Sequence, residues 1–253
     1  MSLRRRLAHT LAAAALLAPA ASAQQDTTAR LNFIFVLTPK PGMAKQLEDG
    51  FKKHIAWHSQ QRDQRAIAVS TVAVGDGVGQ YRVVYRNLRW EDQDRAAPTA
   101  AADIADVNVN LAPYLESTVS LVSVRRDDLS RIPATEPARA MSWVTYVYVK
   151  PGKATEYANY LARLKEAHDG ANSSYRYFVL QVIIGGNTPA FAIVRPGDKW
   201  TDFPPPQNRA VLVRAYGEYE ADRLLNVMDD VVRRTASFVS MQRPDLSYTP
   251  ASR

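Results

Sequence analysis

Histidine is the residue type in this sequence best suited to proton transfer near neutral pH. The sequence contains four histidines and no cysteine, which excludes thiolate catalysis and cysteine metal sites. Three of the histidines, His54, His58 and His168, lie beyond the first 23 residues. An imidazole with an unperturbed pKa of about 6.5 can act as a general base or orient a ligand. With so few histidines, we do not expect a histidine-rich metal site.

An internal repeat relates His58 to His168. Lys40-Pro41-Gly42 recurs as Lys150-Pro151-Gly152, and the same offset of 110 residues connects the two histidines. Further on, SLVSVRRDDLS from residue 120 matches SFVSMQRPDLS from residue 237 at seven of eleven positions. Such self-similarity indicates two copies of one structural unit. We expect copy one at 31–130, a linker at 131–141 and copy two at 142–247.

Both copies predict the same order of elements. Runs rich in β-branched and aromatic residues predict strands at 31–38 and 142–149, and the Pro-Gly that follows each run opens a helical pattern. Two strands, a second helix and a closing strand follow in each copy, and in copy two the second helical pattern covers residues 208–235. The order β-α-β-β-α-β is the ferredoxin-like arrangement, in which both helices cover one face of an antiparallel sheet.

The central strands indicate that both faces of each sheet are covered. The segments AIAVSTVAV (66–74) and YFVLQVII (177–184) are apolar at nearly every position, whereas a sheet with one solvated face alternates apolar and polar residues. The simplest cover for the second face is the other copy. We therefore predict an α+β fold with two tandem ferredoxin-like units whose antiparallel sheets pack into one α/β barrel.

Tandem units with a Lys-Pro-Gly start to the first helix and a tryptophan after the third strand resemble the dimeric α/β-barrel superfamily. This superfamily includes antibiotic-biosynthesis-monooxygenase-like domains. The resemblance covers nearly all of the chain after residue 30 and implies a monomeric pseudo-dimer with ligands between the helices and the sheet of each unit. The superfamily spans cofactor-free oxygenases, haem-degrading enzymes, isomerases and cyclases, so the resemblance predicts a fold and leaves the activity open.

His58 and His168 are the candidate catalytic residues. The apolar spacing of the first helix in each copy places them near its end, on the face directed at the sheet. There each imidazole could serve as a general base. The alternative interpretation is a polar residue that closes the helix and interacts favourably with its carboxyl end.

Several aromatic and basic residues are candidates for ligand binding. Tyr146 and Tyr148 alternate on one face of the first strand of copy two, and Arg82 and Tyr85 lie on opposite faces of the third strand of copy one. Hydroxyls on an apolar surface need partners, and a ligand can be one. The full candidate set is Tyr146, Tyr148, Tyr85, Arg82, Trp90 and Trp200. Alternatively, the tryptophans cap the core and the tyrosines fill the barrel with their hydroxyls at its rim.

The first 23 residues predict a secretory signal. Three arginines precede the apolar run LAAAALLA, and Ala21-Ser22-Ala23 follows at a suitable cleavage position. After its removal, 29 basic and 25 acidic residues remain and are interspersed, so we do not expect nucleic acid as a partner. No later segment is apolar over the length of a membrane span. We expect a periplasmic or secreted protein.

Together these patterns predict an exported protein that binds a small apolar or aromatic molecule between helices and sheet. Any catalysis would be of the cofactor-independent oxygenase or isomerase type, with neither metal nor organic cofactor, and the sequence leaves open whether the protein is an enzyme. The competing hypothesis is a non-catalytic envelope protein in which the repeat serves stability or assembly.

Overall fold

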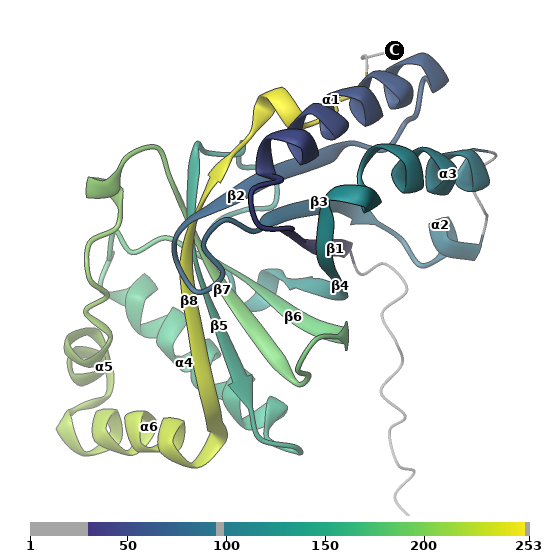
Figure 1. The fold of residues 1–253 in the computed structure, drawn as a ribbon. Coiled ribbons are helices and arrows are strands. Elements are labelled where there is room, and N and C mark those ends of the chain that lie inside the picture. The colour runs from purple at the N-terminus through teal and green to yellow at the C-terminus, as the bar shows by residue number, and fades with distance from the viewer. Residues whose placement is uncertain (1–29, 95–98, 251–253) are drawn as a thin grey trace, which may run out of the picture.

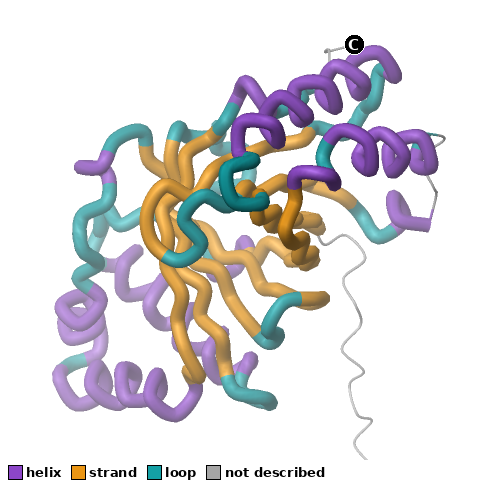
Figure 2. Tube along the Cα trace, in the orientation of Figure 1, coloured by secondary structure: helices purple, strands orange, loops and turns teal. Residues whose placement is uncertain are grey.

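The strands of the protein close into a single antiparallel barrel. The computed structural model describes residues 30–94 and 99–250, so the predicted signal at 1–23 lies outside the described residues. The strand order around the barrel is β1-β3-β2-β8-β5-β7-β6-β4. Helices lie outside the barrel on two opposite sides (Figures 1 and 2). Within the described ranges, no helix combines the length and apolar character needed to cross a membrane.

Each half of the barrel contributes four strands and its own helices. The first half contains β1 (Leu31–Pro39), α1 (Ala44–Gln61), β2 (Ile67–Gly75), β3 (Tyr81–Leu88), α2 (Glu91–Asp94), α3 (Ala100–Asn110) and β4 (Leu115–Arg126). The second half contains β5 (Met141–Val149), α4 (Ala154–Gly170), β6 (Phe178–Gly185), β7 (Ala190–Gly197), α5 (Asn208–Tyr216), α6 (Glu218–Val231) and β8 (Val232–Gln242). The predicted β-α-β-β-α-β order is confirmed in both halves.

The two sheets join edge to edge. The closing strand of each half pairs with the first strand of its own half and with the second strand of the other half, as β4 does with β1 and β6 and β8 with β5 and β2. The predicted covering of one sheet by the other is therefore confirmed as a closed barrel. Continuous antiparallel ladders join the halves, in addition to packing across the interior.

Closure of the barrel explains why the strands carry apolar residues on both of their faces. Alternate strand positions such as Ile34, Val144 and Phe238 face the lumen and form one buried cluster. Neighbouring positions of the opposite parity pack outward against α1 in the first half and against α4, α5 and α6 in the second. The central part of the barrel wall is thus buried on both faces, and each fully buried large apolar side chain contributes about 1.5–3 kcal/mol.

The second helical region of copy two differs from the prediction. Instead of one helix over 208–235, α5 and α6 are separated by Gly217, and residues from Val232 onward form a strand. Gly217 has φ 81° and ψ 165°, a left-handed conformation that interrupts the helix and is accessible mainly to glycine. The strand begins early because Val232 pairs with Val149 of β5, so tertiary pairing overrides the local helical pattern.

The segment after each closing strand crosses to the other half. The 3-10 turn η2 (Asp127–Leu129) follows β4, and its Leu129 is buried in the cluster beneath α4. The corresponding turn η4 (Pro244–Leu246) follows β8, and its Leu246 is buried beneath α1. Residues near 244 that the repeat assigns to copy two therefore pack against the first half.

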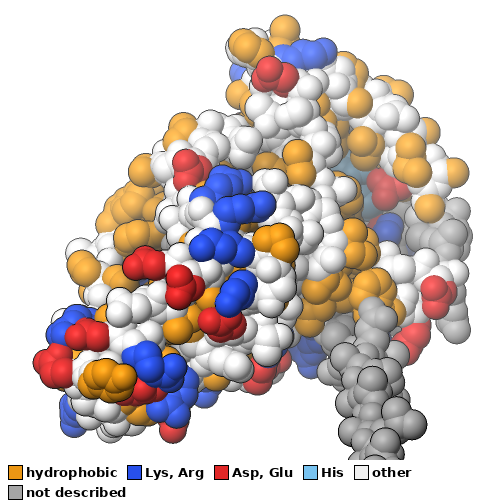
Figure 3. Space-filling view, turned by 90° about the horizontal axis from the view of Figure 1, so that it is seen from below, with side chains coloured by type: hydrophobic (Ala, Val, Ile, Leu, Met, Phe, Trp, Pro, Cys, Tyr) orange, Lys and Arg blue, Asp and Glu red, His pale blue; other side chains and the backbone are white. Residues whose placement is uncertain are grey.

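Charged side chains of both signs are interspersed on the surface. On the face shown in Figure 3, basic side chains lie beside acidic ones with hydrophobic patches between them. In the second half, for example, exposed Arg209 pairs with Glu218 and Asp222. Exposed pairs of this kind contribute little stability, typically about 0–1 kcal/mol.

Candidate functional site

The barrel lumen contains two cavities that open toward opposite ends. One has a volume of about 290 Å³, and residues of the linker, among them Ile132 and Arg139, line it. The other has a volume of about 310 Å³ and opens beside Tyr148 and Arg234. Arg82 and Tyr146 line both cavities. Arg82 and Tyr146 therefore lie between the two cavities.

Arg82 is positioned by aromatic side chains. Its Nη2 donates a hydrogen bond of 2.9 Å to the Tyr146 hydroxyl, and its guanidinium lies 4.5 Å from the ring centroid of Phe238. Arg82, Tyr146 and Phe238 lie on β3, β5 and β8, and all three line the cavity that opens beside Tyr148. Arg82 forms no salt bridge within the described part of the chain. Cation–π contacts with two rings partly compensate the guanidinium for lost water.

A second arginine–tyrosine pair lies at one mouth of the lumen. The guanidinium of Arg234 is 3.9 Å from the ring centroid of Tyr148, and burial raises the pKa of Tyr148. The Tyr148 ring also stacks on Tyr146, with centroids 6.0 Å apart. Three of the predicted ligand-binding residues, Arg82, Tyr146 and Tyr148, are therefore brought together in the lumen.

The other three predicted ligand-binding residues lie elsewhere. Tyr85 is on the outer face of β3, where Arg65 lies over its ring at 5.8 Å. Trp200 is 52% exposed, Trp90 is half-buried, and neither lines a lumen cavity. The lumen cavities lie on the opposite face of the sheet from the helix–sheet layer in which we expected the ligand.

His168 is fully buried at the end of α4 and has neutral partners. Its Nδ1 lies 3.0 Å from the Ser173 hydroxyl and its Nε2 lies 3.1 Å from Oδ1 of Asn208. The ring stacks on Tyr175. Burial lowers the pKa of His168. Both ring nitrogens of His168 therefore have hydrogen-bond partners within the protein, and burial disfavours the charged imidazole.

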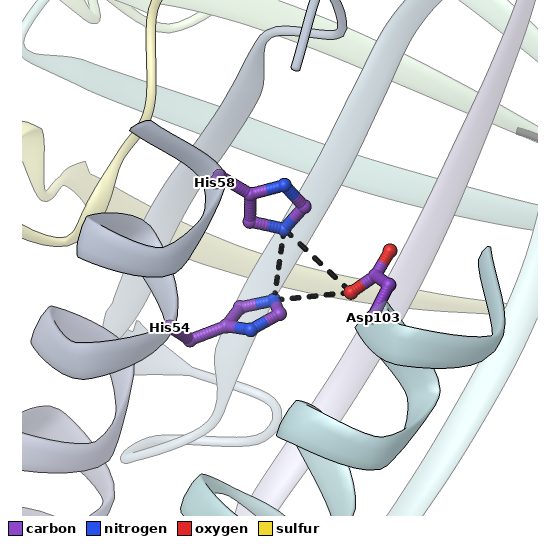
Figure 4. Close-up of side chains that lie close together, drawn as sticks. All are labelled: His54, His58 and Asp103. Atoms are coloured by element: carbon purple, nitrogen blue, oxygen red, sulfur yellow. Dashed lines mark hydrogen bonds and ion pairs between the residues drawn. The ribbon is translucent and has the colours of Figure 1, made fainter. Parts of the chain in front are cut away.

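His58 is also fully buried, but it belongs to a polar cluster. Its Nε2 lies 3.1 Å from Nε2 of His54, and each of these nitrogens lies 3.7 Å from Oδ1 of Asp103. Figure 4 shows the two rings on α1 converging with the carboxylate, which reaches across from α3. Burial, followed by the neighbouring His54, lowers the pKa of His58.

A second set of carboxylates fixes the outer side of each ring. Nδ1 of His54 lies 2.8 Å from Asp106, and Nδ1 of His58 lies 3.0 Å from Asp63. Burial raises the pKa of Asp63, but hydrogen bonds from Arg65 outweigh burial and hold it below its usual value. Arg65 also approaches the outer oxygen of Asp103 at 3.6 Å. Each imidazole is thus oriented by a carboxyl group on its Nδ1 side.

Comparison with known proteins identifies the fold. No protein-family model and no curated protein matches the sequence. Among solved structures, an anthrone oxidase-like protein superposes with a TM-score of 0.56 at 11% identity, over 90% of this chain and 95% of its own. An arginine-to-alanine mutant of chlorite dismutase from Candidatus Nitrospira defluvii gives 0.51 at 11% identity, over 87% and 93%. The fold is the dimeric α/β barrel.

In this dimeric α/β barrel both halves belong to one chain. The sequence predicted only some of the residues that form the candidate site. The position of His54 could have been predicted from the sequence, because it precedes His58 by four residues and so lies on the same helix face. No sequence pattern predicted that Asp103 and Asp106 join the site, because their approach to the histidines depends on how closely α3 packs against α1. Strand alternation placed Arg82 and Tyr85 on opposite faces of one strand, but the lumen position of Arg82 and its contact with Tyr146 required the closed barrel.

Proposed function

We propose that the protein binds a small, flat, largely apolar organic anion in the barrel lumen, with Arg82 as the anchor for the anionic group. The observation that carries this proposal is a half-buried guanidinium against the apolar cluster of the lumen, with no carboxylate at ion-pair distance among the described residues. An arginine that loses water normally gains an ion pair. An aromatic ligand with a carboxylate or phenolate group would supply that partner.

The surroundings of Arg82 support this ligand class. A guanidinium has five N–H donors, and the hydrogen bond to Tyr146 is the one that Arg82 makes to a side chain within the described residues. The rings of Tyr146 and Phe238, 6.2 Å apart, offer flat apolar faces. A cavity of about 290 Å³ lies at the small end of the range of about 300–1,000 Å³ typical of ligand pockets.

The contact between Arg82 and Tyr146 favours a second candidate function, the stabilisation of an enolate. A guanidinium and a phenolic hydroxyl aimed at one oxygen would act as preorganised donors for negative charge that develops on a carbonyl. Enolate formation, in which the C–H proton passes to solvent at the open mouth of the cavity, would be a first step toward isomerisation by reprotonation at another carbon, or toward oxygenation with O₂ as the oxidant. The anthrone oxidase-like neighbour makes aromatic ketones the first compounds to test.

The test is binding of aromatic carboxylates, phenols and anthrone by calorimetry and native mass spectrometry. We expect Arg82→Gln to weaken binding of an aromatic carboxylate by about 10- to 150-fold, the equivalent of a charged hydrogen bond worth 1.5–3 kcal/mol, and Tyr146→Phe to weaken it less. Arg163→Gln is the matched control, because Arg163 also lies over a tyrosine ring but on the outer helix α4. Equal binding by wild type and Arg82→Gln would contradict the proposal.

Enolisation has its own readout. Exchange of the acidic C–H of a bound aromatic ketone with deuterated water, followed by NMR, would accelerate with wild type and slow with Arg82→Gln. If no compound binds in the lumen, the non-catalytic envelope protein becomes the better interpretation.

We further propose that the protein is exported and acts as a single chain. The basic, apolar and small-residue order of the first 23 residues supports export, and amino-terminal sequencing of protein recovered from the periplasm or medium should begin at Gln24. The closed barrel supports a monomer, because its eight strands leave no unpaired sheet edge for a second copy. Light scattering that gives twice the chain mass would contradict the monomer.

A further inference from the structure

The polar cluster between α1 and α3 has an unbalanced set of hydrogen-bonding groups. Carboxylates only accept hydrogen bonds, so Asp106 and Asp63 require a proton on Nδ1 of His54 and of His58. A neutral imidazole with a proton on Nδ1 has a lone pair on Nε2. The two Nε2 atoms then direct lone pairs at each other across 3.1 Å, with an oxygen of Asp103 at 3.7 Å from both.

Three acceptors that converge in this way require a cation between them. A proton between the two Nε2 atoms would give one imidazole a positive charge, whereas a metal ion would leave both imidazoles neutral. The charges around the cluster also favour a larger cation. Asp63, Asp103 and Asp106 contribute three negative charges, and Arg65 is the one basic side chain paired with them in the described ranges. With neutral histidines, two negative charges remain uncompensated.

We propose that His54, His58 and Asp103 form a binding site for a divalent transition-metal ion of the zinc class. Imidazole nitrogens bind Zn²⁺ at about 2.0–2.1 Å, so two such ligands lie roughly 3.0–3.4 Å apart, which matches the observed 3.1 Å. Asp103 needs to approach by a few tenths of an ångström. Two nitrogens and one carboxylate oxygen favour zinc, iron or cobalt over calcium and magnesium, which take oxygen ligands.

The groups behind the ligands have the arrangement that metal sites use. Histidine ligands generally donate their second N–H to a carboxylate or carbonyl, which fixes the ring and increases its basicity. Asp106 and Asp63 do this here, while Asn110 holds Asp106 at 2.9 Å and Arg65 holds Asp63 at 2.9 Å. Three protein ligands leave coordination positions for water or for a further ligand.

The second half supplies an internal control. At the offset of the repeat, His54 corresponds to Leu164 and Asp63 to Ser173, and Asn208 takes the place of a carboxylate beside His168. Nδ1 of His168 faces a hydroxyl that can donate a hydrogen bond to it. Nε2 faces a side-chain amide whose NH₂ group can also be turned to donate a hydrogen bond. The half that lacks the carboxylates therefore has no convergent lone pairs, and we assign metal binding to the first half alone.

The test is direct metal binding by the full, tag-free protein. After chelation, reloading with excess Zn²⁺ and dialysis, we expect one Zn²⁺ per chain by elemental analysis, and titration of the metal-free protein with Co²⁺ should give visible bands of nitrogen and oxygen coordination. Asp103→Asn and His54→Leu, which introduce the kinds of residue found in the second half, should weaken Zn²⁺ binding at least about 100-fold, and Asp106→Asn by about 10- to 100-fold. His168→Gln should bind as wild type.

The outcomes are distinct. Folding of each variant is checked by circular dichroism and thermal melting, and Asp103→Asn keeps the side-chain volume in case His54→Leu does not fold. The proposal is overturned if wild type retains no stoichiometric Zn²⁺, or if Asp103→Asn and His54→Leu retain as much as wild type. In either case the pair of histidines is held together by a shared proton. Loss of ligand binding in the lumen is measured separately and does not bear on this site.

Discussion

The two halves of the barrel place a histidine at the same helix end and surround it differently. His58 and His168 are both fully buried, and each ring stacks on a tyrosine, Tyr248 in the first half and Tyr175 in the second. In the first half the ring nitrogens face a carboxylate and a second imidazole, whereas in the second half they face a hydroxyl and an amide. A repeated position therefore repeats its packing, while its chemistry depends on partners from other elements.

The residue at the helix contact also differs between the halves. Gly50 lies in α1 where a β-carbon would come within 1.9 Å of the Asn110 carbonyl oxygen of α3. At the equivalent position of α4 the residue is Tyr160, which is buried against the sheet and helices of the second half. A glycine at this point lets α1 and α3 approach closely enough for their histidines and aspartates to meet.

The strongest test of this difference is Gly50→Ala. We expect the free energy of unfolding to fall by about 1–3 kcal/mol, because the added methyl group overlaps backbone that has to shift. The helix propensity of alanine offsets part of this loss. Urea unfolding measures the change, and a displaced α3 should also weaken Zn²⁺ binding.

Gly170→Ala at the end of α4 is the matched control. Nothing lies within 4 Å of a β-carbon at Gly170, so the free energy of unfolding should change by less than about 1 kcal/mol. If Gly50→Ala is no more destabilising than Gly170→Ala, close helix approach does not distinguish the halves.

The second half should respond to acid through His168. Its pKa is lowered by burial in the folded protein, so below a pH of about 6.5 the unfolded chain binds a proton that the folded chain does not. The free energy of unfolding should therefore decrease as the pH falls from 7.5 toward 5, with a contribution from this residue of at most about 1.4 kcal/mol per pH unit. Above that window the contribution is fully retained.

Urea unfolding of wild type and His168→Gln at several pH values measures this contribution. The variant lacks the titrating ring, so its stability should depend less steeply on pH between 7.5 and 5. Parallel pH profiles for the two proteins would show that His168 is protonated equally in the folded and unfolded chains.

The smallest expected difference concerns two equivalent arginines after the closing strands. Arg243 bonds Asp245 and also Glu48 of α1, whereas Arg126 bonds Asp128 and the neutral Gln181. We expect Arg243→Ala to lower the free energy of unfolding by about 1 kcal/mol and Arg126→Ala by about 0.5 kcal/mol, because these pairs are partly exposed. Thermal melts at low and high salt compare them, and equal losses would mean that Glu48 adds nothing.

The sequence predicted the architecture better than the site. Continuous apolar strands and a repeat of 110 residues were sufficient for two ferredoxin-like units that share a barrel, because burial on both faces leaves a local signature. The division of the second helix at Gly217 was missed, since a glycine within a helical pattern does not by itself reveal a left-handed conformation. The signal for helix was also stronger than the signal for β8 from Val232 onward, where pairing with β5 decides.

The candidate site depended on contacts that sequence does not encode locally. Arg82 and Tyr146 were correctly placed on strand faces, but whether they share a lumen depends on the closure of β2 with β8 and of β4 with β6. Asp103 enters the histidine cluster because Gly50 allows α3 to approach. Trp90 and Trp200, which were also candidates for ligand binding, do not line the two lumen cavities.

The crossing of the segments after β4 and β8 has a consequence for how the chain can be divided. Leu129 contributes to the second half, and Leu246 and Tyr248 contribute to the first, so neither half contains all of its own interior. Two separate polypeptides that break within the linker at 131–141 should each be poorly folded alone and should become ordered only when mixed. Such a pair of fragments, each fused to another protein, would report when the two fused proteins come together, because reassembly restores both the lumen and the cluster beneath α1.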